Sequence, residues 1–137
     1  MSKLWVFLAD PEDFGWAELQ KDGKAVWDGI KNSRAQNYLK TTEPGDRVLI
    51  YHTAPDKAVI GVAKVTGGPR TDPKAAERVV VDVEPVKVLK RSLPLSELKA
   101  DAVLSEMSFV KMPRVAVQPV TKEQWDRVLD LSGTSLR

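Results

Sequence analysis

The chain has 137 residues, of which 42% are hydrophobic and 29% charged, and a formal net charge of +2. This length and balance fit one ordinary folded domain and exclude disordered, collagen-like and fibrous proteins. We therefore expect a single domain over residues 1–137. Cysteine is absent, which excludes disulfides, thiolate nucleophiles and cysteine-ligated zinc and fits a reducing, cytoplasmic location.

Charge and hydropathy limit the classes of partner. The apolar run within residues 1–10 is too short for the core of a signal peptide or for a membrane span, so we expect no membrane partner. A net charge of +2 permits a nucleic-acid partner without requiring one, because a protein that binds mainly the phosphate backbone usually has a larger basic excess.

The first third of the chain predicts one strand and two short helices. Residues 3–8 are dense in aromatic and branched side chains, which is typical of a strand buried on both faces. The next segment contains three glycines and no hydrophobic period, so we expect a loop with a short helix at 16–21. Ser33 and Gln36 have the spacing of a capping box and predict a second helix, ended by Pro44.

The middle of the chain predicts most of the sheet. Residues 46–53 and 58–65 have the composition of two strands joined by a tight turn. Gly61 inside the second run indicates a bulge or a close approach of another group to the backbone. Glycines and prolines in residues 67–73 predict a surface loop, and the alternation of residues 79–89 predicts one long, bent strand.

The last third predicts short helices and a closing strand. We expect helical turns at 93–98 and 103–107 and a strand at 114–120. A capping box that begins at Thr121 predicts a final helix, which Gly133 is placed to end. Strands outnumber helices, so the predicted fold class is α+β.

Several segments resemble, in order, the sequence pattern of the EVE domain family. Residues 26–39 (VWDGIKNSRAQNYL) are similar to its Trp-x-Gly-Val-Arg-Asn-x-x-Ala pattern, and residues 44–53 (PGDRVLIYHT) to its Gly-Asp-x-x-x-x-Tyr-His-Ser strand. The match continues at 60–65, 81–83, 94–99 and 114–121, so it spans nearly the whole chain. The chain departs from the pattern at Leu8-Ala9, where the family often has a basic residue or serine, at Lys31, where it often has arginine, and at Thr53, where it has serine.

This resemblance implies both a fold and a function. The implied fold is PUA-like, with a curved, barrel-like mixed β-sheet and short helices, and is related to YTH domains, which hold methylated adenine in an aromatic cage. The implied function is that of a non-catalytic module that binds DNA or RNA and recognises a modified base, such as a methylated or hydroxymethylated one. A protein effector that acts on the recognised site is a further expected partner.

The candidates for base binding are aromatic rings and polar groups near them. Extruding a base from a stack costs a few kcal/mol, which stacking on aromatic rings and hydrogen bonds to the base edge can offset. Trp27 lies among polar neighbours outside any amphipathic period, as expected of an exposed functional aromatic. The full set of base-binding candidates is Trp27, Asn32, Tyr51, Thr53, Asp10 and Trp16.

Each of these candidates also has a structural alternative. Trp27 and Tyr51 can be core residues, because buried aromatic side chains are common. Asn32 can serve helix entry instead of a base edge, and Asp10 before a proline can serve a turn. The resemblance further implies that four basic residues near the pocket hold phosphates, although surface cations are often merely solvated; these residues are Lys31, Arg34, Lys111 and Arg114.

The sequence offers little for catalysis. His52 is the only histidine, and neither a Gly-rich phosphate loop nor a Gly-x-Ser-x-Gly elbow is present. The carboxylates of Glu12 and Asp13 fit a solvated turn better than an acid-base pair. We therefore expect no enzyme activity, no metal and no cofactor. The alternative function is a pocket that binds a free nucleoside or another small planar metabolite.

Overall fold

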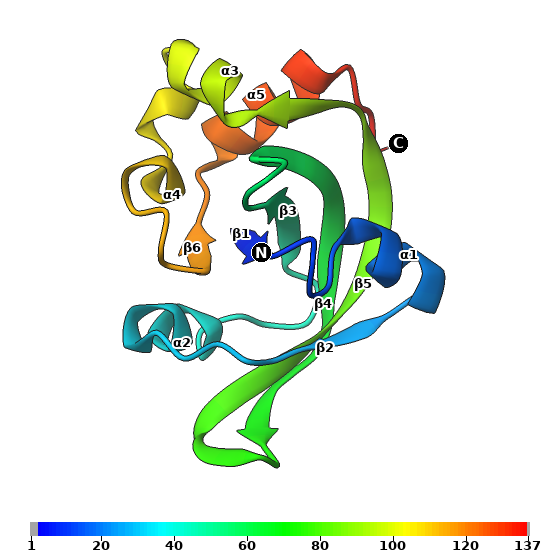
Figure 1. Cartoon of the computed structure of the whole chain (residues 1–137), viewed down its shortest axis with the longest axis vertical. Coiled ribbons are helices and arrows are strands. Elements are labelled where there is room, and N and C mark those ends of the chain that lie inside the picture. Colours follow the sequence, from blue (N-terminus) through cyan, green and yellow to red (C-terminus); the bar gives the residue numbers. More distant parts are fainter. Residues whose placement is uncertain (1–2, 137) are drawn as a thin grey trace.

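The computed structural model describes residues 3–136 of the chain (Figure 1). In chain order, its elements are β1 (Leu4–Ala9), α1 (Trp16–Asp22), β2 (Ala25–Trp27), α2 (Ser33–Leu39), β3 (Arg47–His52), β4 (Ala58–Asp72), β5 (Ala75–Pro94), α3 (Leu95–Ala100), a 3₁₀ turn (Leu104–Glu106), α4 (Ser108–Lys111), β6 (Val117–Pro119) and α5 (Lys122–Ser132). Between residues 3 and 136, none of the helices has the length and apolar content of a membrane span.

The strands form one mixed sheet in the order β2-β5-β4-β3-β1-β6. β1 runs parallel to β3, and every other pair is antiparallel. Figure 1 shows the long strands β4 and β5 curving around β1 and β3, with α3 and α5 at one end of the sheet and the β4–β5 hairpin projecting from the other. The predicted α+β class with a curved mixed sheet is confirmed.

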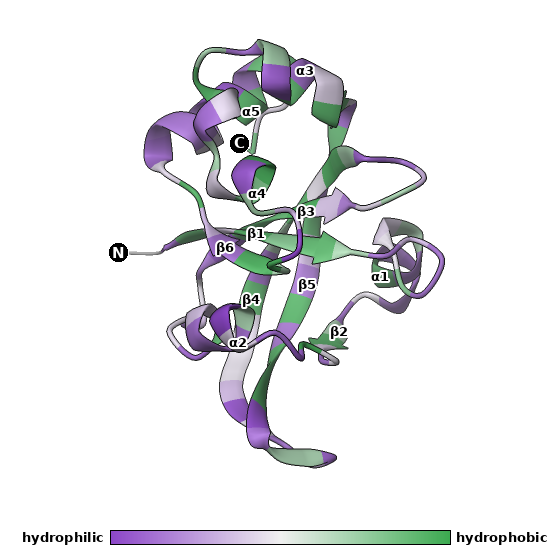
Figure 2. Cartoon of the chain, turned by 60° about the vertical axis from the view of Figure 1, so that its left-hand side comes forward, coloured by the Kyte–Doolittle hydropathy of each residue, from purple (hydrophilic) through white to green (hydrophobic). Residues whose placement is uncertain are grey.

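β1 is buried on both faces, as its sequence predicts. Trp5 and Phe7 pack into a first cluster with α1 and α2, whereas Val6 packs into a second cluster with α3 and α5. Figure 2 shows β1 and β3 as a largely hydrophobic centre between more polar helices. The buried carboxylate of Asp46 joins the two strands, since it accepts hydrogen bonds from the Lys3 backbone N–H (2.8 Å) and the Trp5 indole N–H (2.9 Å).

Two parts of the sheet differ from the prediction. Ala25–Trp27 forms the edge strand β2, which pairs with Val81–Val83 of β5, where we expected a loop. Three residues are too few to show a two-residue period. The predicted loop at 67–73 is instead largely the end of β4. The strand tolerates Pro69 because this residue lies where the β4–β5 pairing is irregular, so its missing N–H removes no ladder hydrogen bond.

The helix ends agree with the sequence in one case and differ in the other. α5 begins with the predicted capping box and ends at Gly133, whose φ is 67°. The capping box predicted at Ser33 is wrong, because Asn32 caps α2 by accepting from the Ala35 N–H at 3.0 Å. The side chain of Gln36 instead bonds the backbone of neighbouring segments, donating to the Ile30 carbonyl at 2.9 Å and accepting from the Val79 N–H at 2.9 Å.

α1 is attached to the sheet through its first residue. The Trp16 N–H donates to Nε2 of His52 at 2.9 Å, so the Nδ1 proton of this imidazole is directed to Asp56, 2.9 Å away. The indole of Trp16 lies directly over Gly61, where an added Cβ would come within 2.7 Å of the ring. The close approach predicted at Gly61 is therefore confirmed, and it fixes the position of α1.

Candidate functional site

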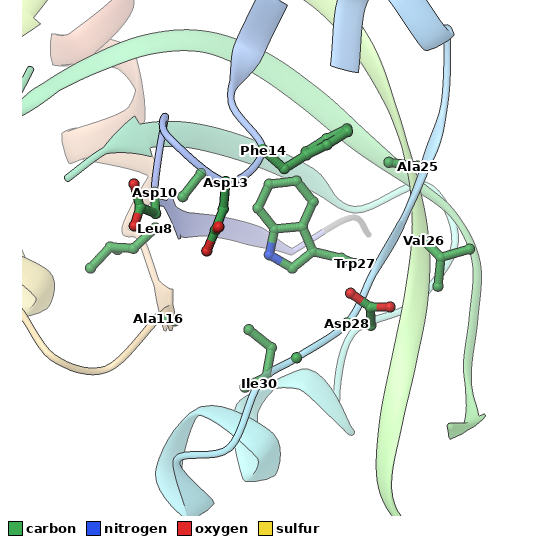
Figure 3. A pocket seen from close by; sticks show the side chains of 12 residues that line it. Leu8, Asp10, Asp13, Phe14, Ala25, Val26, Trp27, Asp28, Ile30 and Ala116 are labelled. Atoms are coloured by element: carbon green, nitrogen blue, oxygen red, sulfur yellow. The ribbon is translucent and has the colours of Figure 1, made fainter. Parts of the chain in front are cut away.

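A pocket of about 520 Å³ opens between the end of β1, the loop that follows it, and β2 (Figure 3). Ligand pockets in proteins commonly have volumes of about 300–1,000 Å³. Ala116 closes one side, because its carbonyl accepts from the Leu8 N–H at 2.8 Å. The lining residues are Leu8, Ala9, Asp10, Asp13, Phe14, Ala25, Val26, Trp27, Asp28, Gly29, Ile30 and Ala116.

Trp27 forms the main aromatic wall of this pocket, and sequence reasoning had selected it. The expected exposed position is wrong, because Trp27 is 7% exposed and belongs to the first cluster, which was its structural alternative. Phe7 packs against its indole, with ring centroids 5.6 Å apart. Phe14 contacts its edge, with centroids 6.3 Å apart and ring planes at 82°. β2 pairs Trp27 with Val81 at the sheet edge, which places the indole beside the pocket opening.

Phe14 is a lining residue that the sequence analysis missed. A compact turn carries it, in which the Asp10 carbonyl accepts from the N–H groups of Asp13 (3.0 Å) and Phe14 (2.9 Å). The Asp10 carboxylate also accepts from the Glu12 N–H at 2.9 Å, so Asp10 has the turn role that was its alternative and also lines the pocket. The signal for Phe14 was available, since it is an aromatic residue in a polar loop, like Trp27.

Tyr51 and Trp16 do not line the pocket. Tyr51 lies in the second cluster, where its ring centroid is 4.8 Å from that of Phe109, and burial raises the pKa of its phenol. The base-binding candidate Tyr51 is therefore a core residue, which was its structural alternative, on the opposite face of the sheet from Trp27. Trp16 lies in the same cluster as Trp27 but covers Gly61.

The two remaining polar candidates also lie outside the lining. The Asn32 side chain caps α2, which was its structural alternative. The Thr53 hydroxyl donates to the carbonyl of Ala9 at 3.4 Å, so it contacts the backbone of a lining residue rather than the pocket itself. Among residues 3–136, no group of three or more histidine, aspartate or glutamate side chains is placed to hold a metal ion.

The four basic candidates are exposed and come from two segments that the fold brings together. Nη1 of Arg34 in α2 lies 3.0 Å from Sδ of Met112, which places α2 beside the segment after α4. Lys31 directly follows the lining residue Ile30, and Arg114 precedes the lining residue Ala116 by two positions. Lys111 also lies 3.4 Å from Glu106. The role of these cations in phosphate binding stays a prediction.

Comparison with known proteins agrees with the sequence resemblance. Thymocyte nuclear protein 1 of Mus musculus is 28% identical to this chain, over 98% of this chain and 75% of that protein. The Rpa0253 protein of Rhodopseudomonas palustris, whose structure was solved by NMR, superposes with a TM-score of 0.91 at 30% identity, over 96% of this chain and 93% of that one. The human THYN1 protein, in a crystal structure with DNA that contains 5-methylcytosine, superposes with a TM-score of 0.85 at 24% identity, over 98% of this chain and 99% of that one.

The family model described as the EVE domain matches residues 3–131, nearly the whole chain. Both superpositions extend over the curved sheet and its short helices. The predicted PUA-like fold is confirmed, and the chain belongs to the EVE domain family.

Proposed function

We propose that this protein binds DNA that carries a modified base, and that the base is extruded into the pocket beside Trp27. The observation that carries this proposal is an aromatic-walled pocket of about 520 Å³ at the edge of the sheet. The human relative in complex with DNA containing 5-methylcytosine supports the choice of ligand. A methylated or hydroxymethylated cytosine is therefore the ligand class that we test first.

The geometry supplies the interactions that an extruded base needs. Unstacking and unpairing cost a few kcal/mol, and a base that contacts an aromatic ring regains about 1–3 kcal/mol. Phe7 packs against the indole of Trp27 and holds it in place, so binding a base costs little additional side-chain entropy for this ring. The cations near the pocket, Lys31 and Arg114 among them, would contact phosphates on either side of the extruded nucleotide.

Tryptophan fluorescence titration with matched DNA and RNA oligonucleotides tests this function. The panel carries cytosine, 5-methylcytosine, 5-hydroxymethylcytosine or N6-methyladenine at one position. We expect DNA with a modified cytosine to bind about tenfold more tightly than unmodified DNA, because a shaped apolar pocket discriminates a single methyl group by about 1–3 kcal/mol. Equal affinity for all of these oligonucleotides would contradict recognition of a modified base.

Replacement of Arg114 by glutamine is expected to weaken binding of modified and unmodified oligonucleotides by the same factor. A phosphate contact carries no sequence information, and its loss reduces the slope of log affinity against log salt by about 1. Titrations at several salt concentrations measure that slope. Arg47, which is exposed on β3, provides a matched Arg→Gln control that should leave the slope unchanged. A loss of affinity confined to the modified oligonucleotide would contradict a phosphate role.

The second candidate function is binding of a free nucleoside or another planar metabolite. The pocket lining favours this alternative in one respect, because it contains no lysine or arginine that could hold a phosphate. Saturable binding of mononucleosides with little salt dependence, together with no binding of oligonucleotides, would support it. Binding of RNA, a cytoplasmic location, a protein effector, the absence of catalysis and a single domain over residues 1–137 stay predictions.

A further inference from the structure

The charged groups that line the pocket are all acidic. Asp10, Asp13 and Asp28 contribute carboxylates, and no basic side chain of the described residues lines it. One oxygen of Asp10 accepts from the Glu12 N–H. The carboxylates of Asp13 and Asp28 make no hydrogen bond or ion pair with any residue between 3 and 136. These negative charges are therefore not neutralised within the pocket.

The pocket also contains a hydrogen-bond donor without a protein acceptor. The side chain of Trp27 is more than nine-tenths buried, and its Nε1–H has no acceptor among the described residues. Figure 3 shows the nitrogen-bearing edge of the indole facing the side of the pocket where Asp13 lies. This N–H is open to the pocket and has no partner among residues 3–136, so an acceptor on a ligand can complete its hydrogen bonding.

Together, these groups define the edge of a complementary ligand. Indole nitrogen only donates hydrogen bonds and a carboxylate only accepts them. The ligand should therefore present an acceptor beside an N–H donor, as a cytosine does with its ring acceptors and its 4-amino group. The known cations near the site, such as Lys31 and Arg114, lie outside the lining. The pocket lining is therefore acidic, whereas the exposed cations that we expect to contact phosphates lie outside it.

We propose, resting on the function proposed above, that the pocket selects its base by charge. It accepts a cytosine whose 5-substituent is neutral, with the 4-amino group toward the carboxylates and a ring acceptor toward the Trp27 N–H. It rejects 5-carboxylcytosine, because an anionic substituent would enter a pocket that holds three carboxylates and no cation. The carboxylates are thereby specificity determinants as well as hydrogen-bond acceptors.

The test compares one oligonucleotide sequence that carries either 5-methylcytosine or 5-carboxylcytosine, at constant pH and ionic strength. For the unmodified protein, we expect the carboxylated oligonucleotide to bind at least about fivefold more weakly. The variant Asp13→Asn should shift the two affinities in opposite directions, weakening the methylated ligand and strengthening the carboxylated one. Opposite shifts cannot result from a general loss of folded protein.

Asp22→Asn is the matched control, because Asp22 is exposed at the end of α1 and does not line the pocket. It makes the same change in net charge and should leave the ratio of the two affinities unchanged. Equal binding of both oligonucleotides by the unmodified protein and by Asp13→Asn would overturn selection by charge while leaving the proposed function intact. No binding of the methylated oligonucleotide would overturn the proposed function and this inference together.

Discussion

Replacement of Trp27 by alanine is expected to weaken binding of an oligonucleotide that contains 5-methylcytosine about 5- to 150-fold, the range that follows from a stacking contribution of about 1–3 kcal/mol. The indole is the largest aromatic surface in the pocket, and Phe14 contacts it only at its edge. Titration followed by fluorescence anisotropy of a labelled oligonucleotide measures the change without using the protein's own tryptophans as the signal.

This substitution also removes buried volume, so its effect on folding needs a control. Trp125→Ala removes the same side chain from a site that is 4% exposed in the second cluster, on the opposite face of the sheet. Both variants should lose about 3–5 kcal/mol of stability, but only Trp27→Ala should lose affinity. Trp27→Leu, which retains apolar volume, gives a second, better folded test. Unchanged affinity in folded Trp27→Leu would contradict the role of the ring.

Replacement of Gly61 by alanine is expected to lower the free energy of unfolding by about 1–3 kcal/mol, because it overpacks the interior. The added Cβ would lie 2.7 Å from Cη2 and Cζ3 of Trp16. The indole has little room to move, because the backbone of Trp16 is bonded to His52 and the ring is 5% exposed. Urea denaturation monitored by circular dichroism measures the loss.

A double-mutant cycle isolates this contact. Trp16→Phe removes the ring atoms that lie over Gly61, so the double variant Gly61→Ala, Trp16→Phe should be more stable than the sum of the two single losses predicts. Additive losses would show that the cost of alanine at position 61 arises elsewhere. Because α1 follows the turn that carries Asp13 and Phe14, a weakened α1 contact should also affect the pocket.

The strand β1 and the helix α5 could be predicted from the sequence, because their local sequence signals agree with their positions in the fold. β1 consists of adjacent apolar residues and is buried on both faces. α5 has a capping box at one end and a glycine at the other, and both have the expected conformations. Trp27 was identified as a pocket residue because it departs from any periodic pattern, and the structure places it in the pocket lining.

The face on which Tyr51 lies could not be read from the sequence. Val48, Leu49, Ile50 and Tyr51 are all buried, so apolar character does not distinguish one face of β3 from the other. The assignment depends on the register with β1, in which Leu8 pairs with Tyr51. Register between strands that are distant in the sequence is a tertiary property, and no local pattern specifies it.

The acidic character of the pocket was missed for a different reason. Asp13 lies in the turn after β1 and Asp28 precedes Gly29, and a solvated carboxylate is the usual interpretation in both contexts. Only the spatial meeting of the loop after β1 with the segment after β2 places them around one cavity. The acidic character of the pocket therefore follows from the tertiary structure and not from the sequence of either segment alone.

The central position of β1 has a consequence for how this chain acquires its function during synthesis. β1 pairs with residues 47–52 on one side and with residues 117–119 on the other, and the Leu8 N–H bonds the carbonyl of Ala116. Such distant pairings close late and slow the folding reaction. A nascent chain can position Trp27 only after residues 81–83 are available to pair with β2, and the pocket lacks its last side until the region of residue 116 has left the ribosome.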